Sequence, residues 1–190
     1  MENYSKEIIT IRFDKEMLEG FTGYSVDNPK EYFKLHPRAK KPPFENLHGK
    51  KRLGLLPSIN KFLNVNDRTQ QNLMKQHLSD YTEYCLRRQG IPHAYLDKYI
   101  VLVVQYKPDQ SKSDNDNTFC KSALDGCTHY EMWKDDNYTQ MKLYLSYSVY
   151  DKQNPRSELV IFPIYKEYTF TQVMRFVAEY IVNLEQKYTK

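Results

Sequence analysis

Apolar residues in this chain follow two different strand patterns. Residues 8–13 alternate, with Ile9, Ile11 and Phe13 on one side, and this pattern indicates a strand with one buried face. Residues 99–106 are instead almost continuously apolar and rich in β-branched side chains, which is typical of a strand buried on both faces. We therefore expect the second stretch to be a central strand of a sheet.

Two other segments show the period of amphipathic helices. In the first, Asp67 and Gln70 form a capping-box pattern, and we expect the helix to run to about Arg88. Its apolar stripe consists of Met74, Leu78, Tyr81 and Cys85. The second helix follows the capping-box pair Thr169 and Gln172. Its apolar face consists of Phe170, Val173, Met174, Val177, Ile181 and Leu184.

The region between these helices is predicted to hold a short helix and a hairpin. The short helix is expected to begin at residue 117 or 118. Residues 140–150 alternate cleanly, and after a turn at 151–155 the run 159–164 is predicted to be the partner strand of a hairpin. This order of elements favours the α+β class, with a mixed or antiparallel sheet packed with helices.

A long stretch without periodicity separates the first strand from the first of these helices. Its prolines are Pro29, Pro37, Pro42 and Pro43, and they disfavour regular structure, so we expect a loop with a short helix near 29–35. Its basic residues are Lys30, Lys34, Arg38, Lys40, Lys41, Lys50, Lys51 and Arg52. Such a run suits contact with a polyanion. A solvated, lysine-rich loop is the alternative.

Composition excludes some classes of protein. Mean hydropathy is −0.78, and no stretch approaches the roughly 20 apolar residues of a spanning helix, so we do not expect a membrane protein. The first residues lack the apolar core of a secretion signal. The 3 cysteines have no C-x-x-C spacing, which favours free thiols in a reducing, cytoplasmic compartment. Cys120, Cys127 and His129 are an alternative zinc set, although their spacing differs from that of zinc fingers.

Candidate chemistry gathers in one acidic stretch. Asp114 and Asp116 are two residues apart, so in an extended backbone both can point at one cation, and Asp136 could complete the shell from another loop. Carboxylates suit Mg²⁺ or Mn²⁺, and such an ion can activate a water molecule beside a phosphodiester. Lys121 would then act as a point charge for the phosphate. The alternative is that residues 113–117 form only a polar turn, because Asp and Asn bond their own backbone.

Three short motifs follow one another in this stretch. They are Asp114-Asn115-Asp116-Asn117, then Lys121 and Asp125, then Trp133-Lys134-Asp135-Asp136. This order resembles the signature of the RusA family of Holliday-junction resolvases: D-x-D-N, a lysine and an aspartate four residues apart, and W-x-D-D. Upstream, residues 56–61 are similar to the family's P-P-S-x-N segment, so the resemblance covers about residues 55–164. Residues 118–120 separate D-x-D-N from the lysine, one residue more than the family usually has.

The resemblance implies a Mg²⁺-dependent homodimer that cuts branched double-stranded DNA in the cytoplasm of a bacterium or phage-infected host. It also implies metal ligation by Asp114, Asp116 and Asp136, with Lys121 as the fourth catalytic residue. Candidate accessory residues are Asn117, Asp125, Lys134 and Asp135. We further expect DNA contacts from Asn60, Lys61, Lys40, Lys41, Lys50, Lys51 and Arg52.

The same resemblance suggests how the chain is divided. Residues 1–54 would be an extension with a strand and a basic loop, residues 55–165 a RusA-like catalytic core, and residues 166–190 a C-terminal helix packed on that core. An alternative function is a non-catalytic RusA-like protein that binds DNA or a partner. A third alternative is a globular protein whose acidic stretch is only a turn.

Overall fold

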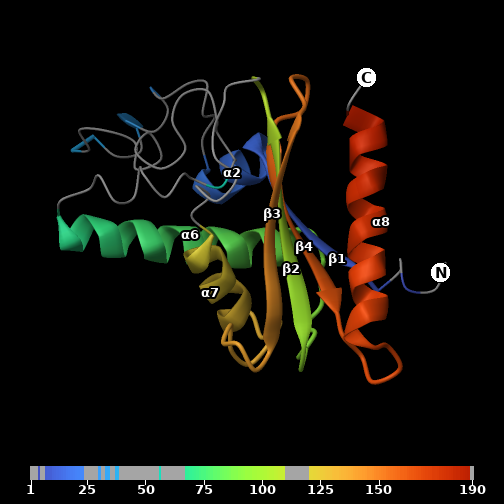
Figure 1. Ribbon diagram of the computed structural model, residues 1–190. Helices are drawn as coiled ribbons and strands as arrows, with labels where there is room; N and C mark the ends of the chain where they lie inside the picture. Colours follow the sequence, from blue (N-terminus) through green and yellow to red (C-terminus); the bar gives the residue numbers. More distant parts are fainter. Residues whose placement is uncertain are drawn as a thin grey trace.

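The structure is a computed structural model, which describes residues 4, 7–23, 30, 33–34, 37–38, 56, 67–109 and 120–188. Its elements are β1 (Ile9–Phe13), α2 (Lys15–Thr22), α6 (Arg68–Arg88), β2 (Tyr99–Lys107), α7 (Lys121–His129), β3 (Met141–Tyr150), β4 (Arg156–Pro163) and α8 (Phe170–Tyr188). Figure 1 shows α8 on one face of the sheet and α2, α6 and α7 on the other. The α+β class with a mixed sheet is therefore confirmed. None of the helices in these ranges is long and apolar enough to cross a membrane.

The sheet has the strand order β1-β4-β2-β3. β2 pairs in parallel with β3 and antiparallel with β4, and β1 pairs antiparallel with β4. Every residue of β2 is buried, which confirms the expected central strand. Parallel neighbours need a crossover connection rather than a tight turn. The acidic motifs lie on this crossover, between the end of β2 and the start of β3.

The predicted hairpin between the last two strands is wrong. β3 and β4 follow one another in the chain, but β2 lies between them in the sheet. Strands on either side of a common neighbour are about 10 Å apart, a gap that the link at residues 151–155 can span at about 3.5 Å per residue. An almost entirely apolar strand is most stable with a neighbour on each side, which favours inserting β2 over leaving it at an edge. β4 also begins at Arg156, before the expected start at residue 159.

Side-chain caps begin α6 and α8 where the pattern predicted. The Asp67 carboxylate accepts hydrogen bonds from the backbone N–H groups of Thr69 (2.8 Å) and Gln70 (3.4 Å). At α8 the box is reciprocal, because the Gln172 side chain accepts from the Thr169 N–H (2.8 Å) and the Gln172 N–H donates to the Thr169 hydroxyl (3.3 Å). Both predicted helix starts are confirmed.

The predicted start of the short helix is wrong. α7 begins at Lys121, and Cys120 precedes it without a side-chain cap. The Cys120 sulfur lies 2.8 Å from the hydroxyl of Tyr144 on β3, which holds this residue against the sheet and outside the helix. The helix expected near 29–35 falls largely outside the described residues.

The pattern of apolar residues did not predict α2. Asp14 begins this helix by accepting a hydrogen bond from the Met17 N–H (2.9 Å). Gly23 ends it with φ 74°, a left-handed conformation that suits glycine. Met17, Leu18 and Phe21 face the core, but in a helix of 8 residues these three positions are too few for their spacing to predict a helix.

Close packing of α7 on α6 depends on Gly126. A Cβ atom at this position would lie 2.6 Å from the Ser79 carbonyl oxygen and 2.8 Å from the Thr82 Cβ. The thiols of Cys85, Cys120 and Cys127 are free and buried in the core between these helices and the sheet. The expectation of free thiols is confirmed.

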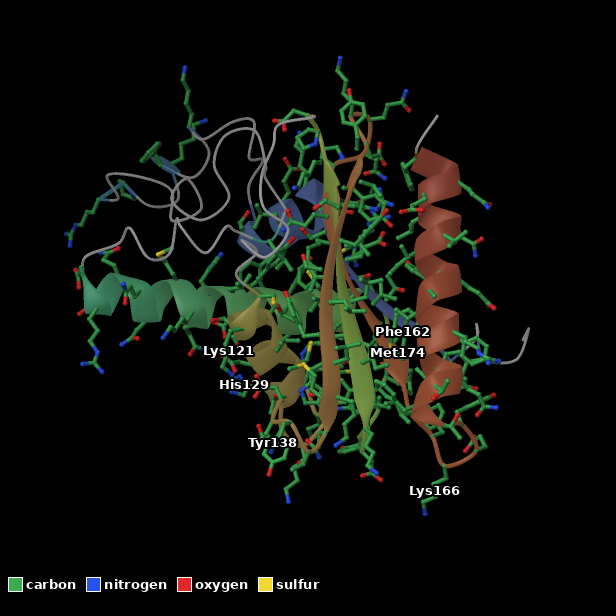
Figure 2. The ribbon with its side chains drawn as sticks, in the orientation of Figure 1. Lys121, His129, Tyr138, Phe162, Lys166 and Met174 are labelled. Carbon is green, nitrogen blue, oxygen red and sulfur yellow. The ribbon has the colours of Figure 1, made fainter. Side chains whose placement is uncertain are left out.

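α8 covers the opposite face of the sheet. Val173, Val177 and Leu184 are buried against it, and Figure 2 shows Met174 of α8 beside Phe162 of β4. Phe170, which was expected on the apolar face, is 46% exposed. That part of the prediction is wrong, because the side chain of this first residue of α8 is left largely in solvent.

A buried ion pair lies on the α8 side of the sheet, at the start of β4. The Arg156 guanidinium donates to the Glu158 carboxylate (2.7 Å) and to Asp151 in the preceding turn (3.0 Å). The Tyr106 hydroxyl donates to Glu158 (2.8 Å), and the Arg156 guanidinium carbon lies 3.4 Å from the Tyr106 ring centre. Arg156 also donates to the hydroxyl of Tyr188, near the end of α8 (3.2 Å). The cluster ties the β3–β4 turn to both β2 and α8.

Candidate active site

The W-x-D-D motif lies in a loop that is fixed to the sheet by its tryptophan. Trp133 is 1% exposed, and its ring stacks on Tyr99 with centroids 4.2 Å apart. Its indole N–H donates to the Thr128 hydroxyl on α7 (2.9 Å). The Leu96 N–H donates to the Met132 carbonyl (2.8 Å), so the loop also pairs with the chain leading into β2. These contacts hold the two following aspartates in place.

Asp135 is engaged within its own turn. Its carboxylate accepts from the Asn137 amide (2.7 Å), and this hydrogen bond lowers the pKa of Asp135. Its N–H donates to the Gln140 side chain (2.6 Å), and its carbonyl accepts from the Tyr99 hydroxyl (3.0 Å). Asp135 therefore shapes the loop, whereas its neighbour Asp136 is directed towards α7.

Lys121, Asp125 and Asp136 meet at the start of α7. The Lys121 ammonium lies 2.6 Å from an Asp136 carboxylate oxygen and 3.1 Å from an Asp125 oxygen. The hydrogen bond to Asp136 raises the pKa of Lys121, so the amine stays charged. Lys121 and Asp125 were expected to share a helix face, and this is confirmed. Side-chain exposure is 64% for Lys121 and 19% for Asp136, so the lysine is open to solvent whereas the carboxylate is largely buried.

A pocket of about 220 Å³ opens between α6, α7 and this loop. It is lined by Lys75, Gln76, Ser79, Asp125, Thr128, His129, Asp135 and Asp136. The His129 Nδ1 lies 3.1 Å from the Ser79 hydroxyl and 3.6 Å from the Glu83 carboxylate, and both of these residues come from α6. Figure 2 shows Lys121 near the start of α7 and His129 near its end.

Sequence reasoning missed the contribution of α6 to this pocket. One signal was present, because Lys121, Asp125 and His129 recur at four-residue intervals and therefore share one face of α7. No comparable signal marked Lys75 or Ser79. Their role depends on how α6 crosses α7, which the spacing along either helix does not determine.

Several predicted site residues fall outside the described residues. They are Asp114, Asp116, Asn117, Asn60, Lys61, Lys40, Lys41, Lys50, Lys51 and Arg52. Leu56, at the start of the segment similar to P-P-S-x-N, is described and buried. Its N–H donates to the Ser157 hydroxyl (2.9 Å) and its carbonyl accepts from the Gln105 side chain (3.5 Å). Lys134 is exposed on the loop.

The donor chemistry of the described aspartates suits a hard divalent cation. Carboxylate oxygens are the ligands that Mg²⁺ and Mn²⁺ prefer, and Asp136 presents one between α7 and the loop. Within the described ranges no group of three or more His, Cys, Asp or Glu residues could hold a metal ion. Burial raises the pKa of Cys120 to about 11, so without a metal this thiol is protonated.

A comparison with protein-family models finds no match for this chain, and a comparison with curated proteins finds no significant match.

Proposed function

We propose that this chain is a Mg²⁺-dependent endodeoxyribonuclease that cuts branched DNA, such as Holliday junctions, by hydrolysing a phosphodiester. The observation that carries the proposal is the 2.6 Å contact between Lys121 and Asp136. Residues from two motifs, 15 positions apart in the chain, meet at one point. A cation beside a carboxylate at a solvent-open pocket is an arrangement that can bind both a metal ion and a phosphate.

Each described residue has a distinct role in this proposal. Asp136, with Asp114 and Asp116, provides carboxylate oxygens for the cation. When bound there, Mg²⁺ or Mn²⁺ would activate the attacking water and neutralise charge on the phosphate. Lys121 contacts a phosphate oxygen, and its raised pKa keeps it positively charged for that contact. Trp133 positions Asp136 by anchoring the loop on Tyr99.

The wider assignment follows the RusA resemblance and belongs to the same proposal. The catalytic core is RusA-like, with residues 1–54 as an extension and α8 as an added helix. The protein acts in the cytoplasm of a bacterium or phage-infected host, and the basic residues of the 40–61 region contact DNA. Two equivalent strands of a symmetric junction need two equivalent sites, which favours a homodimer.

Cleavage of a synthetic four-way junction in Mg²⁺ tests the proposal. Asp114→Asn, Asp116→Asn and Asp136→Asn should each abolish cleavage and leave junction binding measurable, because the amide keeps the shape but is a poorer metal ligand. The matched control is Asp97→Asn, which changes an exposed aspartate outside the site. Wild-type cleavage by all three site variants would refute the proposal.

The same contact is also compatible with the non-catalytic alternative. The Lys121 ammonium already occupies an Asp136 oxygen, so the lysine can neutralise this carboxylate without a metal. A protein of that kind would bind branched DNA and cleave none of it in Mg²⁺ or Mn²⁺. The same junction assay therefore separates the two functions.

A further inference from the structure

Three rings form a stack beside the end of α7. The His93 ring lies 4.5 Å from that of Tyr130 at an interplanar angle of 16°, and the Tyr95 ring follows 6.3 Å from His93 at 23°. The Arg87 guanidinium lies 5.1 Å from the Tyr130 ring centre. Tyr130 is buried, whereas Tyr95 is 66% exposed. The aromatic stack, Tyr130–His93–Tyr95, thus runs from the interior to a ring in solvent.

Strained backbone holds the outer ring of the stack. Tyr95 has φ 49° and Glu131 has φ 58°, a left-handed conformation that bulky side chains rarely adopt. The two residues stabilise each other, because the Tyr95 N–H donates to the Glu131 carbonyl (3.2 Å) and the Tyr95 hydroxyl donates to its carboxylate (2.6 Å). Strain of this kind concentrates at functional sites.

Packing alone does not account for Tyr95. Tyr130 is buried and His93 stacks on it, but most of the Tyr95 ring stays in water despite its unfavourable backbone conformation. A ring fixed at both its backbone and its hydroxyl loses little freedom when a flat ligand stacks on it. The stack therefore suits a planar aromatic ligand that would extend it by one more ring.

The aromatic stack continues the surface of the candidate active site. Ser79 and Glu83 of α6 contact His129 in the pocket, and Arg87, one turn further along, contacts Tyr130. Tyr130, the inner ring of the stack, directly follows His129, which lines the pocket, so the stack lies at the edge of the pocket.

We propose that Tyr95 is a stacking platform for an unpaired nucleobase of branched DNA. The inference rests on the proposed function for the identity of the ligand, because branched DNA such as a fork has unpaired nucleotides beside its branch point. Aromatic side chains stack on any base, so the platform would recognise branching rather than sequence.

A set of forked DNAs tests the platform, each with one abasic site among the unpaired nucleotides nearest the branch. For the wild-type chain, removing the stacked base should weaken binding by about 5- to 150-fold, the range found for single base–aromatic stacks. Tyr95→Asn should bind that abasic fork and the intact fork equally. Asparagine tolerates the left-handed conformation, so this variant removes the ring without adding backbone strain.

Two further variants serve as controls. Tyr95→Phe keeps the ring and should keep the sensitivity to the missing base. Tyr138→Asn changes a tyrosine that is 85% exposed and lies in the loop beyond α7 (Figure 2), and it should bind as the wild type does. The platform is refuted if the wild type does not bind forks, ignores the abasic site at every position, or shares its sensitivity with Tyr95→Asn.

Cleavage of the four-way junction, measured on the same preparations, separates this inference from the nuclease. Cleavage by the wild type without base-dependent binding would refute the platform and leave the nuclease standing. Base-dependent binding that is lost in Tyr95→Asn, with no cleavage in Mg²⁺ or Mn²⁺, would refute the nuclease and leave the platform standing.

Discussion

Replacing Lys121 with glutamine should separate catalysis from stability. The change removes the ammonium that contacts Asp136 and Asp125 and keeps a side chain of similar length. Because Lys121 is 64% exposed and Asp125 is 40% exposed, both ion pairs are screened by solvent. Exposed pairs contribute about 0–1 kcal/mol each, so loss of the two pairs should lower the free energy of unfolding by about 2 kcal/mol at most.

The effect on the proposed reaction should be much larger. A charged donor to the phosphate acts where negative charge develops, and removing one such group typically lowers kcat about 100- to 1,000-fold. Substitutions of Lys121 and of Asp136 should have different effects on the Mg²⁺ concentration that cleavage requires. Lys121→Gln removes the positive charge beside the Asp136 carboxylate, so it should not raise the half-maximal Mg²⁺ concentration, whereas Asp136→Asn should raise it.

Single-turnover cleavage of a four-way junction over a Mg²⁺ series measures both quantities, and urea unfolding measures stability. Lys15→Gln is the matched control, because Lys15 forms a similarly spaced pair with Glu19 on α2, far from the site in sequence. Three results would refute the reasoning: cleavage at the wild-type rate, destabilisation by more than about 2 kcal/mol, which exceeds what two screened pairs contribute, or a raised Mg²⁺ requirement.

Four further substitutions concern the scaffold, and urea unfolding measures the effect of each. Gly126→Ala should lower stability by up to about 2 kcal/mol, because a Cβ atom 2.6 Å from the Ser79 carbonyl oxygen overpacks the α6–α7 contact by more than the gain in helix propensity. Arg156→Met should cost about 3–5 kcal/mol by leaving the buried Glu158 carboxylate without its cation. Glu158→Gln should cost about 1–2 kcal/mol, because the arginine keeps its other hydrogen bonds. Burial lowers the pKa of His77 to about 4, below the usual value of 6.5 in the unfolded chain, so the unfolded state takes up the proton first as pH falls. Stability should therefore drop by up to about 2 kcal/mol from pH 7 to pH 5, and His77→Gln should lack that part of the slope.

Opposite results would contradict each of these arguments. A more stable Gly126→Ala would mean that the helices separate without loss. If Arg156→Met and Glu158→Gln lower the free energy of unfolding equally, then Arg156→Met does not leave Glu158 as an uncompensated buried charge. If His77→Gln loses as much stability as the wild type between pH 7 and pH 5, groups other than His77 cause the pH dependence.

Local features of this fold were readable in the sequence because short-range chemistry determines them. Asp67 and Thr169 cap their helices through bonds to residues two or three positions on, and the apolar run of β2 requires burial wherever it lies. The same holds for Lys121 and Asp125, since four residues make one helical turn. Residues that act within one turn of the chain need no tertiary information.

Strand order was not readable in the same way. A short turn between two alternating strands is the usual sign of a hairpin, yet β2 separates β3 from β4. Pairing is decided by competition among all strands for neighbours, and the most apolar strand gains most from a central position. α2 was missed for a different reason, because a helix of 8 residues is too short for its apolar spacing to be distinguished from a loop.

The sequence by itself determined the candidate residues of this site, through three motifs and the hard-oxygen chemistry of their aspartates. Only the tertiary structure brought Lys121 to Asp136, Ser79 of α6 to His129, and Tyr95 to Glu131. Each of these pairs joins separate segments whose approach depends on how helices and loops pack on the sheet. Packing is a property of the whole chain, whereas motifs and caps are properties of a few residues.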